Sequence, residues 1–414
     1  MNTLLEYEKI NGGVTAPKGF LASGIHCGLK KKKKDLALIY STVPAYAAGI
    51  FTKNRVKAAP IYITKDHLIN SKARAIICNS ANANTCTGKT GLEKAKAMTI
   101  LQGNELNIAA EEVLVSSTGI IGKDLDLESI KQAIPTLTKN LSTNGSKDAA
   151  SAILTTDKYI KELSFEFKIN NKKVRIGAIA KGSGMVHPNM GTILSFITTD
   201  VSIDPNLLKE ALKDSGKISY NRISVDGDTS TNDMVLILAN GLAYNDKITE
   251  KNKDYYTFLK ALNLLNIELS KKIAKDGDGA TKLIECTVQG AKDEIEGEKI
   301  AKRIITSNKI KASLFGGKIN FENIILLLGL ETSHINENNI DIFIETKDAS
   351  IHAIHEGFMI NYDKKILKEI LKADSITIKI ILSKRPSTVT VWGCDLSLEY
   401  IRITGDYRNL KGGY

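Results

Sequence analysis

The sequence predicts a mixed α/β fold in which sheets and helices form layers in two closely packed domains. Short apolar segments of strand length alternate with longer segments of helical period along the chain. The chain has 414 residues, which is long for one domain, so two domains are expected. No repeat of fixed period is found, which argues against solenoids and propellers.

The elements can be placed in order along the chain. Apolar runs bounded by Gly, Ser, Thr or Asn predict strands, and amphipathic runs between them predict helices. The predicted helices span 92–101, 130–137, 206–215 and 255–275. The predicted strands span 36–40, 61–64, 75–78, 113–116, 174–180, 193–197, 234–238, 342–345, 376–382, 388–391 and 400–403.

The boundary between the two domains has only a weak signal. Proline is scarce and no low-complexity linker divides the chain, so we place the boundary near the polar stretch 245–255. This predicts an N-terminal α/β domain of residues 1–245 and a C-terminal α/β domain of residues 246–414.

The composition is that of an ordinary globular protein, with 43% hydrophobic and 25% charged residues. No apolar run reaches the ~18 residues of a membrane span, and the N-terminal stretch does not resemble a signal peptide. The five cysteines form no CxxC pair, which favours reduced thiols in the cytoplasm. We therefore expect a cytoplasmic protein with no membrane partner.

The net charge of +11 raises the question of nucleic-acid binding. Only eight of the 57 basic residues are arginine, the side chain best suited to phosphates and guanines. The densest basic block, residues 30–34, lies between a turn and a strand, and we interpret it as a solvated lysine loop. No nucleic-acid partner is therefore expected.

The usual nucleotide and metal motifs are incomplete. Gly88-Lys89-Thr90 resembles the end of a phosphate-binding loop, but Ala83 stands where that loop needs a glycine. The histidines include one pair three residues apart, His352 and His355, and no HExxH zinc signature. We therefore predict no cofactor and no metal.

The residues most suggestive of chemistry lie in the glycine-rich stretch 180–192, which ends in Gly191-Thr192 before a predicted strand. Attack by the Thr192 hydroxyl on the Gly191 carbonyl would form an ester, and its hydrolysis would free the Thr192 α-amine. Such an amine has a pKa near ~8 and can act as base for its own hydroxyl. A plain glycine-rich turn into a buried strand is the alternative interpretation.

Two more polar segments follow predicted strands. The run 116–122 offers backbone N–H groups and a hydroxyl at a strand end, which suits an oxyanion hole, although a simple turn has the same composition. The run 221–233 is nearly free of large apolar residues. It is either a surface loop or a hydrogen-bonded network, because buried polar groups need partners.

Several unusual runs occur in one order along nearly the whole chain: residues 12–20, 78–84, 117–122, 154–157, 181–192, 221–233, 277–282 and 406–408. Together they resemble the ornithine acetyltransferase (glutamate N-acetyltransferase) family of arginine biosynthesis. The resemblance implies the layered fold of self-cleaving enzymes with an N-terminal nucleophile. It also implies cleavage between Gly191 and Thr192 into an α chain, 1–191, and a β chain from 192, which assemble as a heterotetramer.

The resemblance also implies roles for single residues. Thr192 would be the acetyl-accepting nucleophile, and Thr118 and Gly119 would form the oxyanion hole. Lys181, Asp278 and one or both of Thr155 and Thr156 would contact the substrate, as would Thr192, Thr404 and Asn409. N-acetylornithine would acetylate Thr192 and leave as ornithine, and glutamate would then take the acetyl group. The family needs no prosthetic group or metal, and some members accept acetyl-CoA as donor.

The chain departs from the family pattern at several places. The residue before Thr192 is Gly191 rather than alanine, and Asp278 replaces the usual glutamate. The stretch 315–323 loses most of a family motif. Thr404 and Asn409 stand where the family has an asparagine and a final hydroxyl residue. A carboxylate shorter by one methylene typically changes binding by on the order of 1–3 kcal/mol. We therefore expect the reaction type to be retained and the choice of amino acid to be open.

Three other functions stay open from the sequence. A specialised acyltransferase would use another amino-acid acceptor, and the departures at Asp278 and 319–323 favour it modestly. An N-terminal-threonine amidohydrolase would use the same Thr192 and pass the acyl group to water. A non-catalytic basic binding protein would stay uncut.

Overall fold

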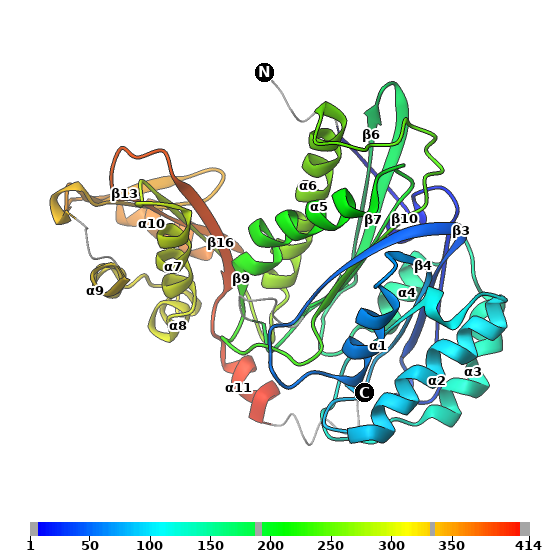
Figure 1. Cartoon of the computed structure of the whole chain (residues 1–414). Coiled ribbons are helices and arrows are strands. Elements are labelled where there is room, and N and C mark those ends of the chain that lie inside the picture. The colour runs from blue at the N-terminus through cyan, green and yellow to red at the C-terminus, as the bar shows by residue number, and fades with distance from the viewer. Residues whose placement is uncertain (1–6, 187–192, 332–335, 406–414) are drawn as a thin grey trace.

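Two mixed sheets organise the chain, and each belongs to one lobe of the molecule (Figure 1). The structure is a computed structural model that describes residues 7–186, 193–331 and 336–405. The larger lobe contains a nine-stranded sheet and the smaller lobe a seven-stranded one, both with helices packed on them. The predicted mixed α/β class is thereby confirmed.

The large sheet has the strand order β1-β6-β7-β8-β10-β3-β4-β5, with β2 paired to β3. Its central strands β7 and β8 are antiparallel, whereas β8 and β10 are parallel. The strands are β1 (Glu8–Ile10), β2 (Phe20–Ile25), β3 (Leu36–Phe51), β4 (Lys72–Asn79), β5 (Val113–Ser117), β6 (Lys161–Ile169), β7 (Lys172–Lys181), β8 (Leu194–Thr199) and β10 (Met234–Ala239).

Helices cover both faces of this sheet, which agrees with the continuous apolar run of its strand β10. On β10, Val235 and Ile237 pack with the core under α5 (Pro205–Ile218) and α6 (Lys253–Lys275). The alternate residues Leu236 and Leu238 pack on the opposite face with α4 (Ser146–Ile153). Three further helices pack against β3, β4 and β5, namely α1 (Ala59–His67), α2 (Gly88–Leu106) and α3 (Leu127–Lys139).

The small sheet has the order β14-β13-β12-β15-β11-β16-β9. Alternate residues of β15, such as Ile376 and Ile378, point into a core that the helices cover. The strands are β9 (Ile223–Ser224), β11 (Leu283–Gln289), β12 (Asp341–Glu345), β13 (Ser350–His355), β14 (Phe358–Met359), β15 (Ser375–Ile381) and β16 (Thr388–Cys394). The helices are α7 (Glu294–Ile305), α8 (Asn308–Phe315), α9 (Phe321–Glu331) and α10 (Lys364–Lys372).

The two lobes are tied together by backbone and side-chain bonds. Strand β9 lies within residues 1–245, the predicted N-terminal domain, yet it pairs with β16 of the small sheet through Ile223 and Trp392. Lys311 of α8 is buried and donates from Nζ to the carbonyl of Val225, just after β9. The predicted division into 1–245 and 246–414 stays a prediction, because packing alone does not say which part folds independently.

Two predicted strands are wrong, because both segments form helices. Residues 61–64 belong to α1, where Pro60 suits the first turn and the buried Ile61, Thr64 and His67 recur every three residues. Residues 400–403 belong to α11 (Leu398–Gly405), whose first turn is capped by Ser397 Oγ. Their β-branched residues match the strand pattern, whereas Pro60 and Ser397 are the signals of a helix start.

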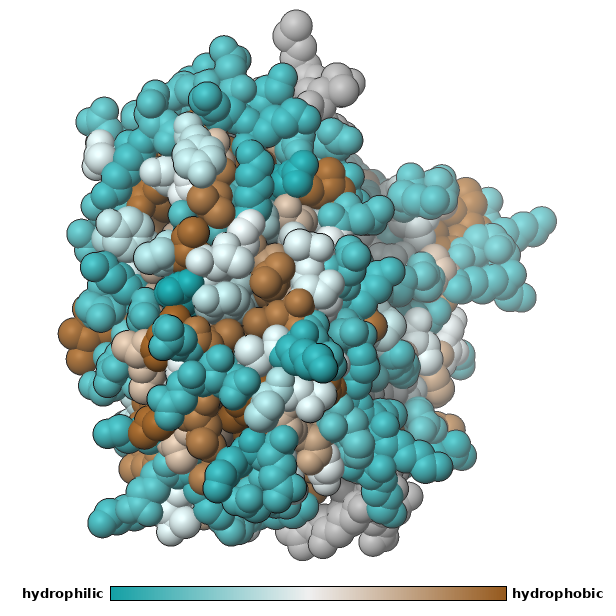
Figure 2. All heavy atoms as spheres, turned by 90° about the vertical axis from the view of Figure 1, so that its right-hand side faces the viewer, coloured by the Kyte–Doolittle hydropathy of each residue, from teal (hydrophilic) through white to brown (hydrophobic). Residues whose placement is uncertain are grey.

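The surface of the large lobe carries both apolar and hydrophilic side chains. Figure 2 shows apolar groups near the middle of the face that lies to the right in Figure 1, interrupted and bordered by hydrophilic ones. Among the residues the structure describes, no helix has both the length and the apolar character that crossing a membrane requires.

One glycine of the large sheet has no room for a side chain. A Cβ on Gly177 of β7 would lie 1.8 Å from the carbonyl oxygen of Gly13. We expect Gly177→Ala to lower the free energy of unfolding by about 1–3 kcal/mol or more, because backbone must move. The matched control Gly329→Ala lies in α9 with nothing within 4 Å and should stabilise by up to about 1 kcal/mol. Equal effects in urea unfolding of the two variants would contradict the close approach.

Candidate active site

Four buried charges meet where β6 begins, β7 ends and α6 ends. Lys181 Nζ, at the end of β7, lies 3.8 Å from Asp157 Oδ2. Lys161 Nζ, at the start of β6, donates to Asp157 Oδ1 at 2.7 Å and to Asp276 Oδ2 at 2.5 Å. The side chains of Lys161, Asp157 and Asp276 have no exposed surface, and Lys181 has almost none. Two positive and two negative groups thus balance inside the protein.

Burial and pairing pull the pKa values of these groups in different directions. Burial lowers the pKa of Lys181, and Asp157 opposes that shift. Burial also opposes ionisation of Asp157, but Lys181 and Lys161 outweigh it and hold the pKa of this carboxyl below its usual range. Asp157 is therefore the anion that pairs with the buried Lys181, beside the predicted substrate residue Thr155.

The predicted substrate residues Thr156 and Asp278 are joined through one serine. Thr156 Oγ1 donates to Ser183 Oγ at 2.5 Å, and Ser183 Oγ donates to Asp278 Oδ1 at 2.5 Å. Thr155 is held through its backbone, because its N–H donates to Asp157 Oδ2 at 3.1 Å. The structure therefore brings Thr155, Thr156, Lys181 and Asp278 to one place, although Asp278 is far from the other three in the sequence.

The glycine-rich segment after Lys181 is held by two carboxylates. A Cβ on Gly184 would lie 2.3 Å from Asp278 Oδ2, so only glycine fits against that carboxylate. Asp226 accepts from the backbone N–H groups of Met185, at 2.5 Å, and Val186, at 2.9 Å. Gly191 and Thr192, the predicted cleavage site and nucleophile, lie outside the described residues, as does Asn409.

Asp233 holds the chain on the other side of Thr192. Its Oδ1 accepts from the N–H of Ile193 at 3.0 Å, whereas its buried Oδ2 has no hydrogen-bond partner within the described ranges. Burial raises the pKa of Asp233 well above the usual range of a carboxyl. We had not selected Asp233 from the sequence. The signal was present, since an acid within a polar run directly before the buried strand β10 needs a partner.

Thr118 and Gly119 directly follow β5, at the predicted oxyanion hole. Thr118 N–H donates to the carbonyl of Asn79 at 3.0 Å, so this amide is already used. The hydroxyl of Thr118 makes no hydrogen bond with any other residue that the structure describes. Gly119 has φ +132°, and a Cβ on it would lie 2.3 Å from the carbonyl carbon of Ala81. Only glycine permits this close approach.

The polar run 221–233 is partly a network and partly an exposed loop. Asn232 Nδ2 donates to the carbonyls of Ala83, at 2.6 Å, and Ser117, at 2.8 Å, and so ties the run to the strand end before Thr118. Gly227 and Asp228, by contrast, are exposed. Both interpretations of this run are therefore correct, each for a different part.

Lys30 is the exception to the interpretation of residues 30–34 as a solvated loop, whereas residues 31–33 are exposed as expected. It is only 3% exposed, and its Nζ donates to the carbonyls of Lys34, at 3.0 Å, and Leu154, at 2.7 Å. Because Leu154 precedes Thr155, Lys30 fixes the backbone at the predicted substrate residues. Burial lowers the pKa of Lys30 to about 8, although Asp35 opposes the shift.

Two other positions singled out from the sequence lie on α11 and in the small lobe. Thr404 is exposed on α11, one helical turn after Tyr400. Within the divergent stretch 315–323, Phe321 packs in the core of the small lobe and Asn323 Nδ2 donates to Ser307 Oγ at 2.9 Å. These two residues therefore make structural contacts within the small lobe.

Comparisons with known proteins agree with the motifs. The sequence model of the ArgJ family matches residues 21–409. The arginine biosynthesis bifunctional protein ArgJ 1 of Clostridium acetobutylicum is 46% identical over 400 residues, 96% of this chain and 98% of its own. ArgJ of Bacillus subtilis is 44% identical over 401 residues, 97% of each chain. A crystal structure of ornithine acetyltransferase complexed with ornithine, from Mycobacterium tuberculosis, is 36% identical, covering 44% of this chain and 98% of that chain with a TM-score of 0.41.

The buried Lys30 predicts a pH-dependent stability. Its pKa falls from the ordinary 10.5 to about 8 on folding, so between these values the unfolded state binds more protons and stability rises with pH. We expect the wild type to gain about 2 kcal/mol over Lys30→Met between pH 7.5 and 9.5, measured by urea unfolding. Below pH 8 the lysine is charged in both states and this gain vanishes. Parallel pH profiles for the two proteins would contradict the assignment.

Proposed function

Since the chain belongs to the ArgJ family of arginine-biosynthesis enzymes, we propose that it transfers an acetyl group from N-acetylornithine to glutamate through Thr192. The observation that carries the proposal is the convergence of Lys181, Thr156 and Asp278 through Ser183, at the start of the segment that leads to Thr192. A solved relative is an ornithine acetyltransferase bound to ornithine, which agrees with an amino-acid substrate.

The first proposed step is self-cleavage. The Thr192 hydroxyl attacks the Gly191 carbonyl, the peptide C–N bond breaks as the ester forms, and the nitrogen takes a proton to become the Thr192 α-amine. Water then hydrolyses the ester and leaves a carboxylate on Gly191. Asp233 is suited to receive the new ammonium group, because its Oδ1 already holds Ile193 N–H and its Oδ2 lacks a partner among the described residues.

The second proposed step is acetyl transfer in two halves. The Thr192 amine removes the proton of its own hydroxyl, which attacks the acetyl carbonyl of N-acetylornithine, and ornithine leaves. The amine of glutamate then attacks the acetyl-threonine and restores the hydroxyl. The Thr118 hydroxyl and the Gly119 N–H are the proposed donors to the tetrahedral oxyanions. These steps involve no metal or prosthetic group, and acetyl-CoA is an alternative acetyl donor.

Charge and free hydrogen-bonding groups suggest how the substrate is held. The Lys181 amine suits the substrate carboxylate, and the Asp278 carboxylate suits the amine at the far end of ornithine. The Thr156 hydroxyl already donates to Ser183, whereas the Thr155 hydroxyl has no partner among the described residues. We therefore assign the substrate contact to Thr155. The α chain, 1–191, and the β chain, 192–414, are proposed to assemble as a heterotetramer.

Cleavage at Thr192 is the direct test of the nucleophile. We expect the wild type to run as two fragments on a denaturing gel, with the smaller product of residues 1–191 and a second beginning at Thr192 by N-terminal sequencing. Thr192→Ala should remain one chain because it has no hydroxyl, whereas Thr192→Ser should still be cut. A folded wild-type chain that stays uncut would reject the mechanism. Acetate release that added glutamate fails to suppress would favour the amidohydrolase instead.

The shortened carboxylate at position 278 gives a test of the substrate. If Asp278 contacts the distal amine of ornithine, Asp278→Glu should raise kcat/KM for N-acetylornithine about tenfold relative to shorter N-acetylated diamino acids. Asp228→Glu, on the exposed loop nearby, is the control and should leave the ratio unchanged. An unaltered ratio in Asp278→Glu would show that another group sets selectivity.

A further inference from the structure

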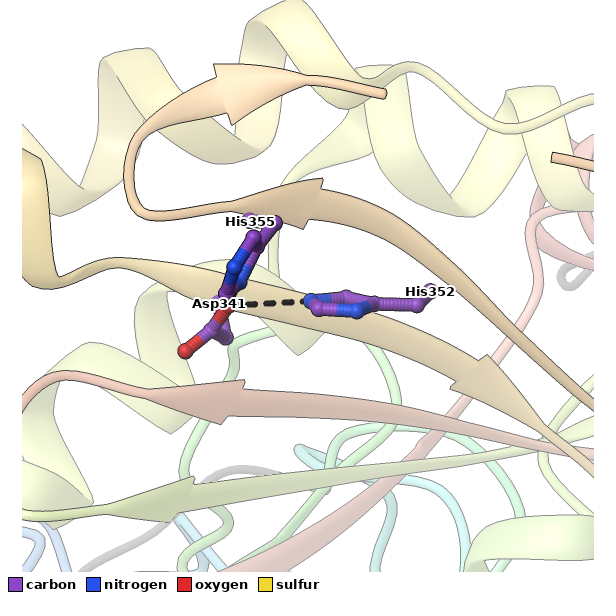
Figure 3. A group of neighbouring side chains, drawn as sticks. All are labelled: Asp341, His352 and His355. Carbon is purple, nitrogen blue, oxygen red and sulfur yellow. Dashed lines mark hydrogen bonds and ion pairs between the residues drawn. The ribbon is translucent and has the colours of Figure 1, made fainter. Parts of the chain in front are cut away.

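Three metal-ligating side chains converge on the small lobe, away from the residues discussed above (Figure 3). His352 Nε2 lies 2.9 Å and His355 Nδ1 lies 2.8 Å from the same oxygen, Oδ1 of Asp341. One potential ligand atom from each of the three side chains lies within 4.8 Å of the other two. The side chain of His355 is exposed, and those of His352 and Asp341 are half-buried, so solvent reaches the cluster.

The backbone creates this cluster through a β-bulge. Residues three apart on a regular strand point to opposite faces of the sheet, so His352 and His355 would normally diverge. Here Ile342 of β12 pairs with Ile354 and Phe343 pairs with His352, which leaves Ala353 as an extra residue in β13. The bulge turns both histidines to the outer face, where Asp341 lies. The core-facing Ala353 and Ile354 are both buried, as the bulge requires.

One histidine is also fixed in orientation. The His352 ring stacks on Phe343, with ring centroids 4.1 Å apart and an interplanar angle of 12°. The stacking and the bond to Asp341 together hold the His352 Nε2 toward the centre of the cluster (Figure 3). A ligand with a fixed ring loses less rotational freedom when a metal binds.

We propose that His352, His355 and Asp341 form a binding site for zinc, with water completing the coordination. Two imidazole nitrogens and one carboxylate are a ligand set that Zn²⁺ takes with an open position, whereas Mg²⁺ and Ca²⁺ prefer oxygen ligands throughout. When the metal binds, its bonds to the three side chains take the place of the hydrogen bonds from His352 and His355 to Asp341 Oδ1. It clamps β12 to β13 near the edge of the small sheet, and so stabilises the folded chain. The proposal is independent of the acetyl-transfer reaction.

Zinc titration of the metal-free full-length protein tests the site. We expect isothermal titration calorimetry with ZnCl₂ to show one binding event that weakens at least about tenfold in His352→Gln and in His355→Gln. The midpoint of thermal unfolding should rise with zinc in the wild type and stay constant in both variants. Asp341→Asn, which keeps the shape of the side chain but not its charge, should also bind more weakly.

His26→Gln is the matched control, because His26 lies 3.2 Å from Asp35 but belongs to no three-ligand cluster among the described residues. It should bind zinc as the wild type does. Acetyl transfer should be the same in His352→Gln as in wild type, so failure of this proposal is separable from failure of the enzymatic one. Equal zinc binding in all variants, displacement of zinc by millimolar Ca²⁺, or no binding below millimolar zinc would each overturn the site.

Discussion

The buried group of Lys161, Lys181, Asp157 and Asp276 is the constraint on which the rest of the site depends. Each member comes from a different place: the start of β6, the end of β7, the loop after α4 and the residue after α6. Removing one partner of such a group leaves a buried charge unpaired, which typically costs about 3–5 kcal/mol. The four charges therefore fix three segments relative to one another: the 155–157 loop, the end of β7 and the turn that carries Asp278. One group of ion pairs does this, rather than three separate packing contacts.

Carboxylates act as backbone clamps on both sides of the 187–192 segment. Asp226 accepts from Met185 and Val186, and Asp233 accepts from Ile193. Both acids come from the polar run 221–233, and Asn232 of the same run reaches Ser117 beside Thr118. A single loop thus connects the proposed nucleophile to the proposed oxyanion hole. Self-cleavage requires a hydroxyl to stay close to the preceding carbonyl, and fixed chain ends on both sides reduce the freedom that would separate them.

Sequence reasoning succeeded where one local signal dominates. The central strand β10 was predicted because burial on both faces makes a continuous apolar run. The site roles of Lys181 and Asp278 come from a family resemblance and stay predictions, although the structure brings both residues into one region. Residues 61–64 and 400–403 were misjudged because β-branched residues occur in both helices and strands, and only Pro60 and Ser397 mark the helices. Lys30 and Asp233 were missed for another reason. Lys30 is buried because it bonds to Leu154, more than a hundred residues away in the sequence. Asp233 is buried because of how the strands pack. No local sequence pattern indicates either of these contacts.

The small lobe has a direct part in the site, because it holds the turn that carries Asp278. Asp395, directly after β16, accepts from the backbone N–H groups of Thr281, at 2.8 Å, and Lys282, at 3.0 Å. Ser397 Oγ donates to the carbonyl of Gly279 at 2.6 Å and also caps α11. Gly279 has φ +68° and no room for a Cβ beside Tyr400 N, so α11 can dock only against glycine. The distance from Asp278 to Lys181 is therefore a property of how the two lobes are joined. On the proposed role of Asp278, a change in the small lobe would alter substrate selectivity without touching any residue that contacts the substrate.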